Sequence, residues 1–251
     1  MMNITPVVKQ LLIINVIFYI GSQLIGDQAY KMFALYYFEN PDFRFWQPLT
    51  HMFMHAPMPN LSHILFNMFG LYSFGSALEH YWGGKKFLFF YISCGLGAAV
   101  VQSLANLYFF HGALNGLVEA GFPKSEVLSI LNEGKFNTKW QEILTATDFK
   151  SLLGSYMGTA VGASGAIYGI IVAFAFMFPN AELALMFIPV PVKAKYFVPV
   201  LVGIDLFSGV TGFSIFGDGN VAHFAHVGGA LFGFIMMWFW KKNQFNNTRF
   251  N

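Results

Sequence analysis

The stretch Tyr156–Phe178, YMGTAVGASGAIYGIIVAFAFMF, decides the fold class. It carries no charged side chain, and an apolar run of about 20 residues is long enough to cross a bilayer as a helix. Comparable runs recur along the chain, and the sequence predicts one all-α membrane domain over residues 1–251. We predict six membrane spans, at Leu11–Ile25, Leu61–Leu78, Phe87–Phe110, Tyr156–Phe178, Tyr196–Phe213 and Ala222–Trp240.

The composition supports a membrane protein and excludes other classes. Hydrophobic residues make up 56% of the chain and charged residues only 10%, whereas an ordinary soluble domain carries about 25% charged residues. So few charges cannot cover a water-soluble surface. The net charge of +2 is too small to attract nucleic acid. Cys94 is the single cysteine, which excludes an intramolecular disulfide framework.

The distribution of lysine and arginine predicts the orientation of the spans. Cytoplasmic loops keep the excess of these residues, and this pattern predicts that both termini are cytoplasmic. The outer loops are then residues 27–60 and 111–154. In the second outer loop, Ser125–Leu131 and Trp140–Leu144 are amphipathic, and we expect short helices that rest on the bilayer there. The loop 179–195 should be compact and irregular.

Polar side chains at membrane depth are costly and by default indicate a functional site. Spans two, four and six all enter the membrane from the outer face in the predicted topology. His63 and Asn67 lie near the start of span two, Ser164 near the start of span four, and His223 and His226 near the start of span six. All of them therefore belong to the outer half of the membrane, as a shared site requires.

Ser164 has the surroundings of a nucleophile. Gly162 and Gly165 permit unusual backbone angles and favour a helix that begins at Ser164 itself. A helix from Ser164 to Pro179 is about 24 Å long, so it begins below the outer surface of a hydrocarbon core of about 30 Å. Its free N–H groups would lie beside the hydroxyl. The alternative is helix packing, because Gly165-x-x-x-Gly169 is a small-xxx-small pattern.

His226 is the candidate general base. Its neighbours at i−4, i+3 and i+7 are Ala222, Gly229 and Gly233, and this small stripe lets another helix approach the face that presents the imidazole. The ring would then reach a serine hydroxyl on span four. An interhelical hydrogen bond is one alternative. A metal site shared with His223 is another, which we set aside because no acidic third ligand is evident nearby.

His63 and Asn67 lie at i and i+4, so both face the same side of one helix. Both can donate hydrogen bonds to a developing oxyanion, or they can simply join helices. Tyr168 is one turn beyond Ser164 and is placed to pack on the His226 ring, unless it is only core. Asp205 receives no catalytic role: either Ser208 is its partner or it lies near the inner surface.

Taken together, these residues resemble the rhomboid family of intramembrane serine proteases. Any one motif is weak, but four of them occur in family order over most of residues 40–240. The motifs are Gly162-Ala-Ser-Gly165 with Tyr168; Ala225-His226 with Gly229 and Gly233; His63-Ile-Leu-Phe-Asn67 leading to Gly70, Gly75 and Glu79; and Trp46 to Thr50 with Phe53 and His55.

The resemblance implies a six-helix membrane protease with a serine–histidine dyad and neither metal nor cofactor. In this reading His226 activates Ser164 and an acyl-enzyme forms, with no third acidic member. Further roles follow by position: an oxyanion hole from His63, Asn67 and the Ser164 N–H; support of the base by Tyr168; the turn before the nucleophile at Gly162; and packing or structural roles for Gly165, Glu79, Gly229 and Gly233.

The resemblance also implies membrane-protein substrates, cut near the outer end of their membrane helix, with a preference for small side chains before the cut. We expect a bacterial inner membrane location. The chain departs from the family at Trp46-Gln47, where Trp-Arg is frequent, and Arg44 is the candidate to pair with Glu79 instead. Two other readings stay open: a catalytically inactive rhomboid-like protein that binds membrane clients, and a small transporter.

Overall fold

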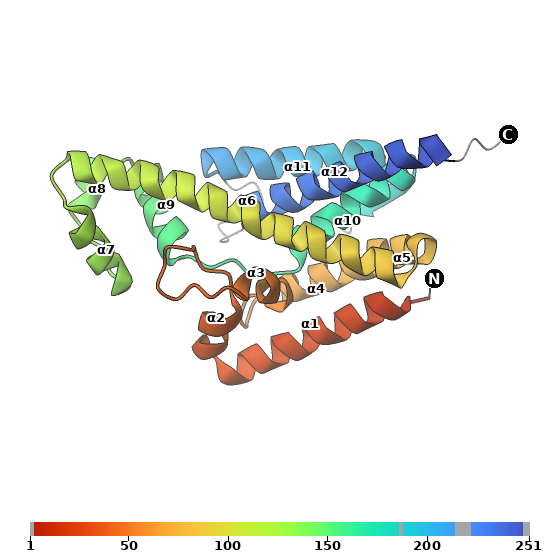
Figure 1. Cartoon of the computed structure of the whole chain (residues 1–251), viewed down its shortest axis with the longest axis horizontal. Coiled ribbons are helices and arrows are strands. Elements are labelled where there is room, and N and C mark those ends of the chain that lie inside the picture. The colour runs from red at the N-terminus through yellow and green to blue at the C-terminus, as the bar shows by residue number, and fades with distance from the viewer. Residues whose placement is uncertain (1–2, 186–187, 214–221, 248–251) are drawn as a thin grey trace.

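The protein is a helical bundle with a small helical module at one end (Figure 1). The computed structural model describes residues 3–185, 188–213 and 222–247. Within these residues, four helices are long and apolar enough to cross a membrane: Pro6–Ile25, Gly84–Glu119, Ala194–Thr211 and His223–Lys241. The predicted helical membrane fold is confirmed, while the count of six spans stays a prediction.

The elements follow one another with short connections. In chain order they are α1 (Pro6–Ile25), α2 (Asp27–Phe33), α3 (Gln47–Thr50), η1 (His51–Phe53), α4 (Leu61–Gly70), η2 (Leu71–Gly75), α5 (Ser76–Trp82), α6 (Gly84–Glu119), α7 (Lys124–Asn132), α8 (Trp140–Ile143), α9 (Ala146–Met157), α10 (Ser164–Met177), β1 (Glu182–Leu185), β2 (Ile188–Lys193), α11 (Ala194–Thr211) and α12 (His223–Asn247).

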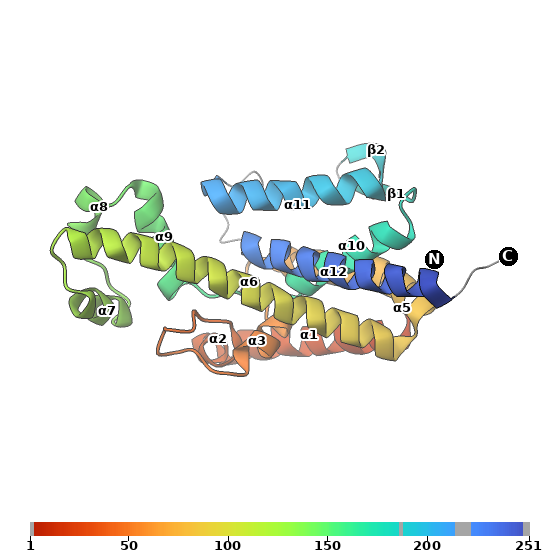
Figure 2. The same cartoon turned by 45° about the horizontal axis from the view of Figure 1, so that its top comes forward.

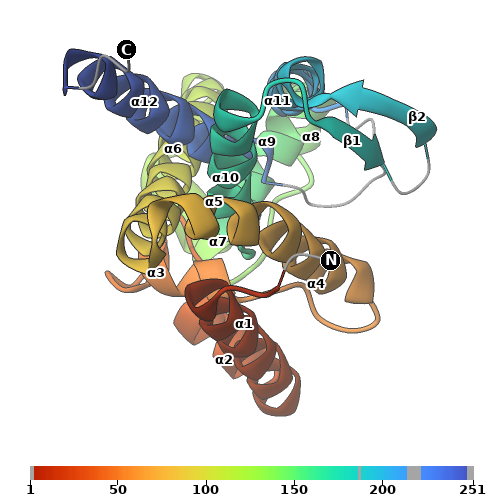
Figure 3. The same cartoon turned by 90° about the vertical axis from the view of Figure 1, so that its right-hand side faces the viewer.

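Helix α10 lies at the centre of the bundle, in contact with α5, α6, α11 and α12 (Figure 3). Most of its side chains are buried, including Ala166, Ile170 and Ala173. It begins at Ser164 rather than at Tyr156, because Tyr156 is among the last residues of α9. With 14 residues it is about 21 Å long, which is shorter than a hydrocarbon core of about 30 Å.

Glycines bring α10 and α12 together backbone to backbone. A Cβ atom on Gly229 would lie 1.8 Å from the carbonyl oxygen of Gly165, and one on Gly233 would lie 2.7 Å from the Cα atom of Gly169. No side chain fits at either contact. The small stripe on α12 therefore permits the close approach for which it was singled out, and it fixes the register of the two helices.

The outer module is built on an extension of α6. This helix has 36 residues, or about 54 Å, and it runs past the ends of α11 and α12 to meet α7, α8 and α9 (Figure 2). Val127, Leu131 and Trp140 are buried against this extension and α9. The expected short helices α7 and α8 are present, with their largest apolar side chains packed on protein, while Ile143 of α8 stays 40% exposed. That they rest on the bilayer stays a prediction.

The loop 179–195 differs from its prediction, and the structure shows the contacts of Glu79. The loop 179–195 is not irregular: it forms the antiparallel hairpin β1–β2, with Glu182 opposite Lys193. Glu79 has a structural role at the opposite end of the bundle from the outer module. Its carboxylate accepts hydrogen bonds from the Thr5 hydroxyl and from the backbone N–H groups of Val7 and Val8. It thereby caps the first turn of α1.

Candidate active site

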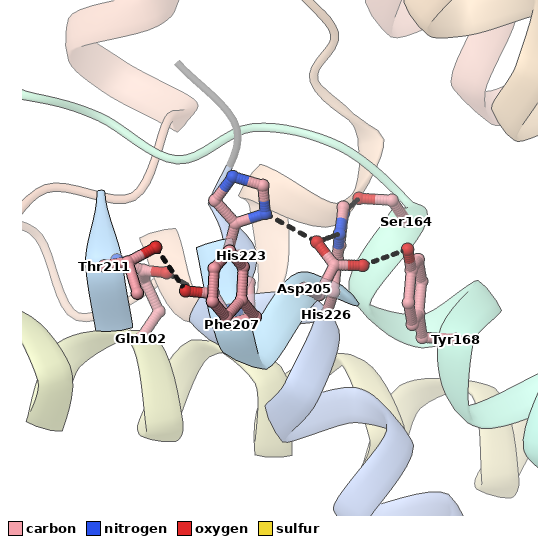
Figure 4. Close-up of polar contacts among 9 residues, drawn as sticks. Gln102, Ser164, Tyr168, Asp205, Phe207, Thr211, His223 and His226 are labelled. Atoms are coloured by element: carbon pink, nitrogen blue, oxygen red, sulfur yellow. Dashed lines mark hydrogen bonds and ion pairs between the residues drawn. The ribbon is translucent and has the colours of Figure 1, made fainter. Parts of the chain in front are cut away.

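The Ser164 hydroxyl and the His226 imidazole meet inside the bundle. Ser164 is the first residue of α10 and His226 lies in the first turns of α12. Ser164 Oγ is 2.8 Å from His226 Nε2, which is hydrogen-bond distance (Figure 4). The two side chains that were predicted to meet are thus in direct contact, 62 residues apart in the sequence.

The turn before Ser164 depends on Gly162. This residue has a φ of 129°, which L side chains rarely adopt. A Cβ atom there would also lie 2.9 Å from His63 Nε2. The Gly162 N–H donates to the carbonyl of His51 at 3.0 Å, so the turn is tied to the outer loop. The chain therefore enters α10 at a fixed angle that presents the hydroxyl.

Two neighbours hold the His226 ring and its helix. The Tyr168 ring stacks on the imidazole, with centroids 4.2 Å apart and planes 10° from parallel. This stacking is the contact suggested by its position one turn beyond Ser164. On the other side, the N–H of Ala225 donates to Gln102 Oε1 of α6 at 3.1 Å. The base is thus oriented both by its ring face and by its backbone.

Asp205 completes the arrangement. Its Oδ1 lies 3.1 Å from His226 Nδ1 and 2.6 Å from His223 Nδ1, and its Oδ2 accepts a hydrogen bond from the Tyr168 hydroxyl (Figure 4). The side chain is buried, with 5% of the residue exposed. The prediction that no acidic third member is present is therefore wrong. Of the two alternatives for Asp205, pairing with Ser208 is wrong because its partners are His223, His226 and Tyr168, and a position near the inner surface does not fit its contact with His226.

The sequence contains a signal for the position of Asp205. An intramembrane carboxylate is costly and normally has a partner. In the predicted topology, span five runs toward the outer face, and α11 ends at Thr211 soon after Asp205. Depth alone therefore places Asp205 near the level of Ser164 and His226. What the sequence did not supply is which side of α11 faces α10 and α12.

The contact with Asp205 assigns the proton on His226. A carboxylate oxygen can only accept, so Nδ1 of His226 carries the hydrogen. Nε2 is then an acceptor, and the Ser164 hydroxyl donates to it. A serine, a histidine and a carboxylate aligned in this way form the arrangement of serine hydrolases, in which the base takes the proton of the nucleophile.

His63 reaches the same site from α4. Its Nδ1 accepts a hydrogen bond from the Ala56 N–H at 3.1 Å, so in the neutral ring Nε2 is a donor. That Nε2 is the atom closest to the position of a Cβ on Gly162, and Ser164 Oγ lies 3.5 Å from the same point. A hydrogen-bond donor and the Ser164 hydroxyl thus flank one small space.

Asn67 is less directly placed. It is buried, but its Nδ2 donates to the carbonyl of His63 within its own helix at 2.8 Å. A primary amide has two N–H groups, so one of them is used by this bond. The structure therefore brings His63 to the serine and leaves Asn67 one helical turn away from that contact.

Two buried histidines of the segment 27–60 lie beside the site. Burial lowers the pKa of His51 to about 4 and the pKa of His55 to about 3. The His55 ring packs edge-on against the His63 ring, with centroids 5.3 Å apart. Both outer rings are neutral at neutral pH, so they form part of the packing that keeps the loop closed over α4.

Gln47 stands where an arginine is frequent in the family that the sequence resembles, and its contacts explain the difference. The Gln47 side chain is fully buried; it accepts from the backbone of Arg44 and donates to the carbonyls of Lys31 and Asp42. Arg44 instead donates to the carbonyls of Pro41 and Phe43 at the surface. The suggestion that Arg44 pairs with Glu79 is therefore wrong, and Gln47 organises the loop.

The fold and the site define an integral membrane protein in which the serine hydroxyl at the start of a central helix contacts a histidine ring, and a carboxylate lies at the other nitrogen of that ring. The comparison with known families agrees: the Rhomboid domain matches residues 42–122 and 142–243. The match covers more than half of the chain and includes Ser164, Asp205 and His226. The protein belongs to the rhomboid family, whose members are generally intramembrane serine proteases that act on membrane proteins.

Proposed function

We propose that this protein is an intramembrane serine endopeptidase. One observation carries the proposal: the Ser164 hydroxyl lies 2.8 Å from His226 Nε2, while Asp205 holds the opposite nitrogen of the same ring. Ser164 is the nucleophile and His226 the general base. Asp205 is a positioning residue that acts through His226, so the proposed machinery is a triad and not the dyad expected from the resemblance.

The reaction begins with proton transfer from the serine. His226 Nε2 takes the proton of the Ser164 hydroxyl as its oxygen attacks the peptide carbonyl carbon, and the imidazole becomes positively charged. The Asp205 carboxylate stabilises this charge, and the stacked Tyr168 ring keeps the imidazole in plane. No rotation of His226 is needed, since both of its nitrogens are already engaged.

The tetrahedral intermediate needs donors for its oxyanion. His63 Nε2 borders the space beside Ser164, and the first turn of α10 has N–H groups that no side chain caps. Asn67 supplies a further donor through the amide hydrogen that its helix does not use. We assign these groups as the oxyanion hole, with His63 as its principal side chain.

The acyl-enzyme forms when His226 returns its proton to the leaving amine and the C–N bond breaks. A water molecule then gives a proton to His226 and attacks the ester carbonyl, which releases the new carboxyl terminus and restores Ser164. The substrate must be locally unwound, because the carbonyl groups of a helix are occupied by its own hydrogen bonds.

The substrates proposed are membrane proteins, cut near the outer end of a transmembrane helix after a small side chain. The short α10 supports this depth, because its first residue lies below the outer surface when its last reaches the inner one. We further propose that both termini are cytoplasmic and that the membrane is a bacterial inner membrane. In this orientation, Lys193 of the β1–β2 hairpin, Lys195 at the start of α11 and the lysines near the end of α12 lie on the cytoplasmic side.

Labelling with a fluorophosphonate tests the proposal. Wild type in detergent should be modified at one serine, and Ser164→Ala and His226→Ala should lose the label. Ser62→Ala, which alters an exposed serine at the start of α4, should label like wild type. A model membrane substrate in vesicles should be cut only by the variants that label.

The same experiment separates the rival functions. A client-binding protein would retain the model substrate on co-purification without labelling or cleavage in wild type. A transporter would move a solute or a proton across the vesicle membrane. Neither wild type nor Ser164→Ala would then cleave the model substrate. Undiminished labelling of Ser164→Ala would refute the assignment of the nucleophile.

A further inference from the structure

Three atoms that typically ligate metals converge beside the proposed triad. Asp205, His223 and His226 each offer one ligand atom, and these three atoms all lie within 4.8 Å of one another. The mechanism above uses Asp205 and His226 and assigns no step to His223. We propose that these three residues form a zinc site, and that zinc bound there switches off the protease. The second half of this inference rests on the proposed function.

The ligand set and spacing suit zinc. Imidazole nitrogen and carboxylate oxygen are standard zinc ligands, at about 2.0–2.2 Å, and tetrahedral geometry then separates neighbouring ligand atoms by about 3.4 Å. Asp205 Oδ1 is 2.6 Å from His223 Nδ1 and 3.1 Å from His226 Nδ1. To reach the required value, the two separations must lengthen by about 0.8 Å and about 0.3 Å. Three protein ligands leave a fourth position for water.

In the sequence analysis, a metal site at His223 and His226 was set aside because no acidic ligand was evident. Asp205 of α11 is that acidic ligand. His223 and His226 are three apart on α12 and therefore share one side of that helix. Asp205 faces them from the neighbouring helix. Two imidazoles select zinc over magnesium or calcium, both of which prefer ligand sets made entirely of oxygen.

Charge and accessibility also favour a cation. The Asp205 carboxylate is a negative charge inside the bundle, where an uncompensated charge is costly. Its side chain is 7% exposed, while those of His223 and His226 are 17% and 13% exposed. The site is thus mostly enclosed and still in reach of water. His223 begins α12, so it is the ligand nearest the end of its helix.

Zinc binding and catalysis exclude each other at His226. In the active form, Nδ1 carries the hydrogen and Nε2 accepts from Ser164. A zinc ion on Nδ1 takes its lone pair, so the single hydrogen of the neutral ring moves to Nε2. That nitrogen then only donates, and the serine loses its base. Asp205 is at the same time drawn from orienting the ring to ligating the metal.

Zinc binding is tested first in a protein that needs no activity. Untagged, metal-stripped Ser164→Ala protein in detergent is titrated with Zn²⁺ against a chromophoric chelator, and with Co²⁺ for the visible absorption of a tetrahedral site. We expect one ion per chain. Adding His223→Gln should weaken binding at least about 10-fold. His111→Gln is the matched control, because His111 also pairs with a carboxylate, Glu39, at 3.1 Å, and should bind unchanged.

Inhibition is tested in the active enzyme, with each variant compared to its own zinc-free rate. Zinc should stop cleavage reversibly, a chelator should restore it, and His223→Gln should raise the half-inhibitory concentration at least about 10-fold. The inference is overturned if Ser164→Ala binds no zinc saturably, or if His223→Gln binds zinc or is inhibited as well as its parent. A chain that binds one zinc but never cleaves refutes the proposed function and leaves the zinc site standing.

Discussion

Replacing the buried Asp205 carboxylate with an amide tests the part of the site that was not predicted from the sequence. Asp205→Asn keeps the size of the side chain and removes its charge. At 3.1 Å and an effective dielectric constant of about 20, the interaction between the carboxylate and a protonated His226 is worth about 5 kcal/mol. That is about 10⁴-fold in rate. His223 and Tyr168 share the same carboxylate, so we expect a loss of between about 10² and 10⁴.

The assay measures cleavage of a model membrane substrate in vesicles, with the turnover number and the Michaelis constant determined separately. The loss should fall on kcat, because Asp205 acts through His226 and does not touch the substrate. Ser208→Ala is the matched control: Ser208 is buried one turn further along α11, and this variant should cleave like wild type. An Asp205→Asn rate within threefold of wild type, in folded protein, would refute the triad.

Three further outcomes follow from the structure. Gly229→Ala should lower the cleavage rate at least about 100-fold, because the new methyl group overlaps the Gly165 carbonyl and shifts the base from the nucleophile by about 1 Å or more. Glu79→Ala should lower the unfolding free energy by about 2–4 kcal/mol, seen as a lower melting temperature, because buried donors at the start of α1 lose their acceptor. Melting temperatures should also fall as the pH drops from about 6.5 to about 4. The His51 ring stays neutral in the folded state until about pH 4, whereas an unfolded ring takes up its proton near 6.5, a difference of about 3 kcal/mol.

These outcomes have their own controls. Gly112→Ala places a methyl group on α6 where nothing lies within 4 Å, so it should retain wild-type activity and show that the effect of Gly229→Ala is local. Glu79→Gln keeps an acceptor at the start of α1 and should recover part of the lost stability. His51→Gln should reduce the acid sensitivity. Unchanged sensitivity in that variant would contradict the assignment of the proton uptake to His51.

The sequence allowed a prediction of the depth of the polar side chains in the membrane, but not of the direction in which each helix face turns. Apolar length and the placement of polar residues indicated which groups lie at one level, and Ser164 and His226 are indeed in contact there. Small residues on α12 indicated that another helix approaches closely. Neither signal states which face of α11 turns inward. The role of Asp205 therefore emerges only when α10, α11 and α12 are packed together.

The outer loops were harder to predict for a different reason. An amphipathic stretch such as Ser125–Leu131 has an apolar face, and that face can be covered by lipid or by protein. The sequence does not distinguish the two, because both coverings satisfy the same pattern. What decides the outcome is the length of α6, which continues past the bundle and offers Phe110, Leu114 and Leu117 as a packing surface.

The glycine contact between α10 and α12 has a mechanical consequence. A helix interface made of side chains can loosen when those side chains change rotamer. A direct contact between two backbones cannot loosen in this way. The helix that carries Ser164 and the helix that carries His226 can therefore separate only as rigid bodies. In a lipid environment whose thickness and lateral pressure vary, their spacing is consequently set by van der Waals contact between backbone atoms rather than by the surrounding medium.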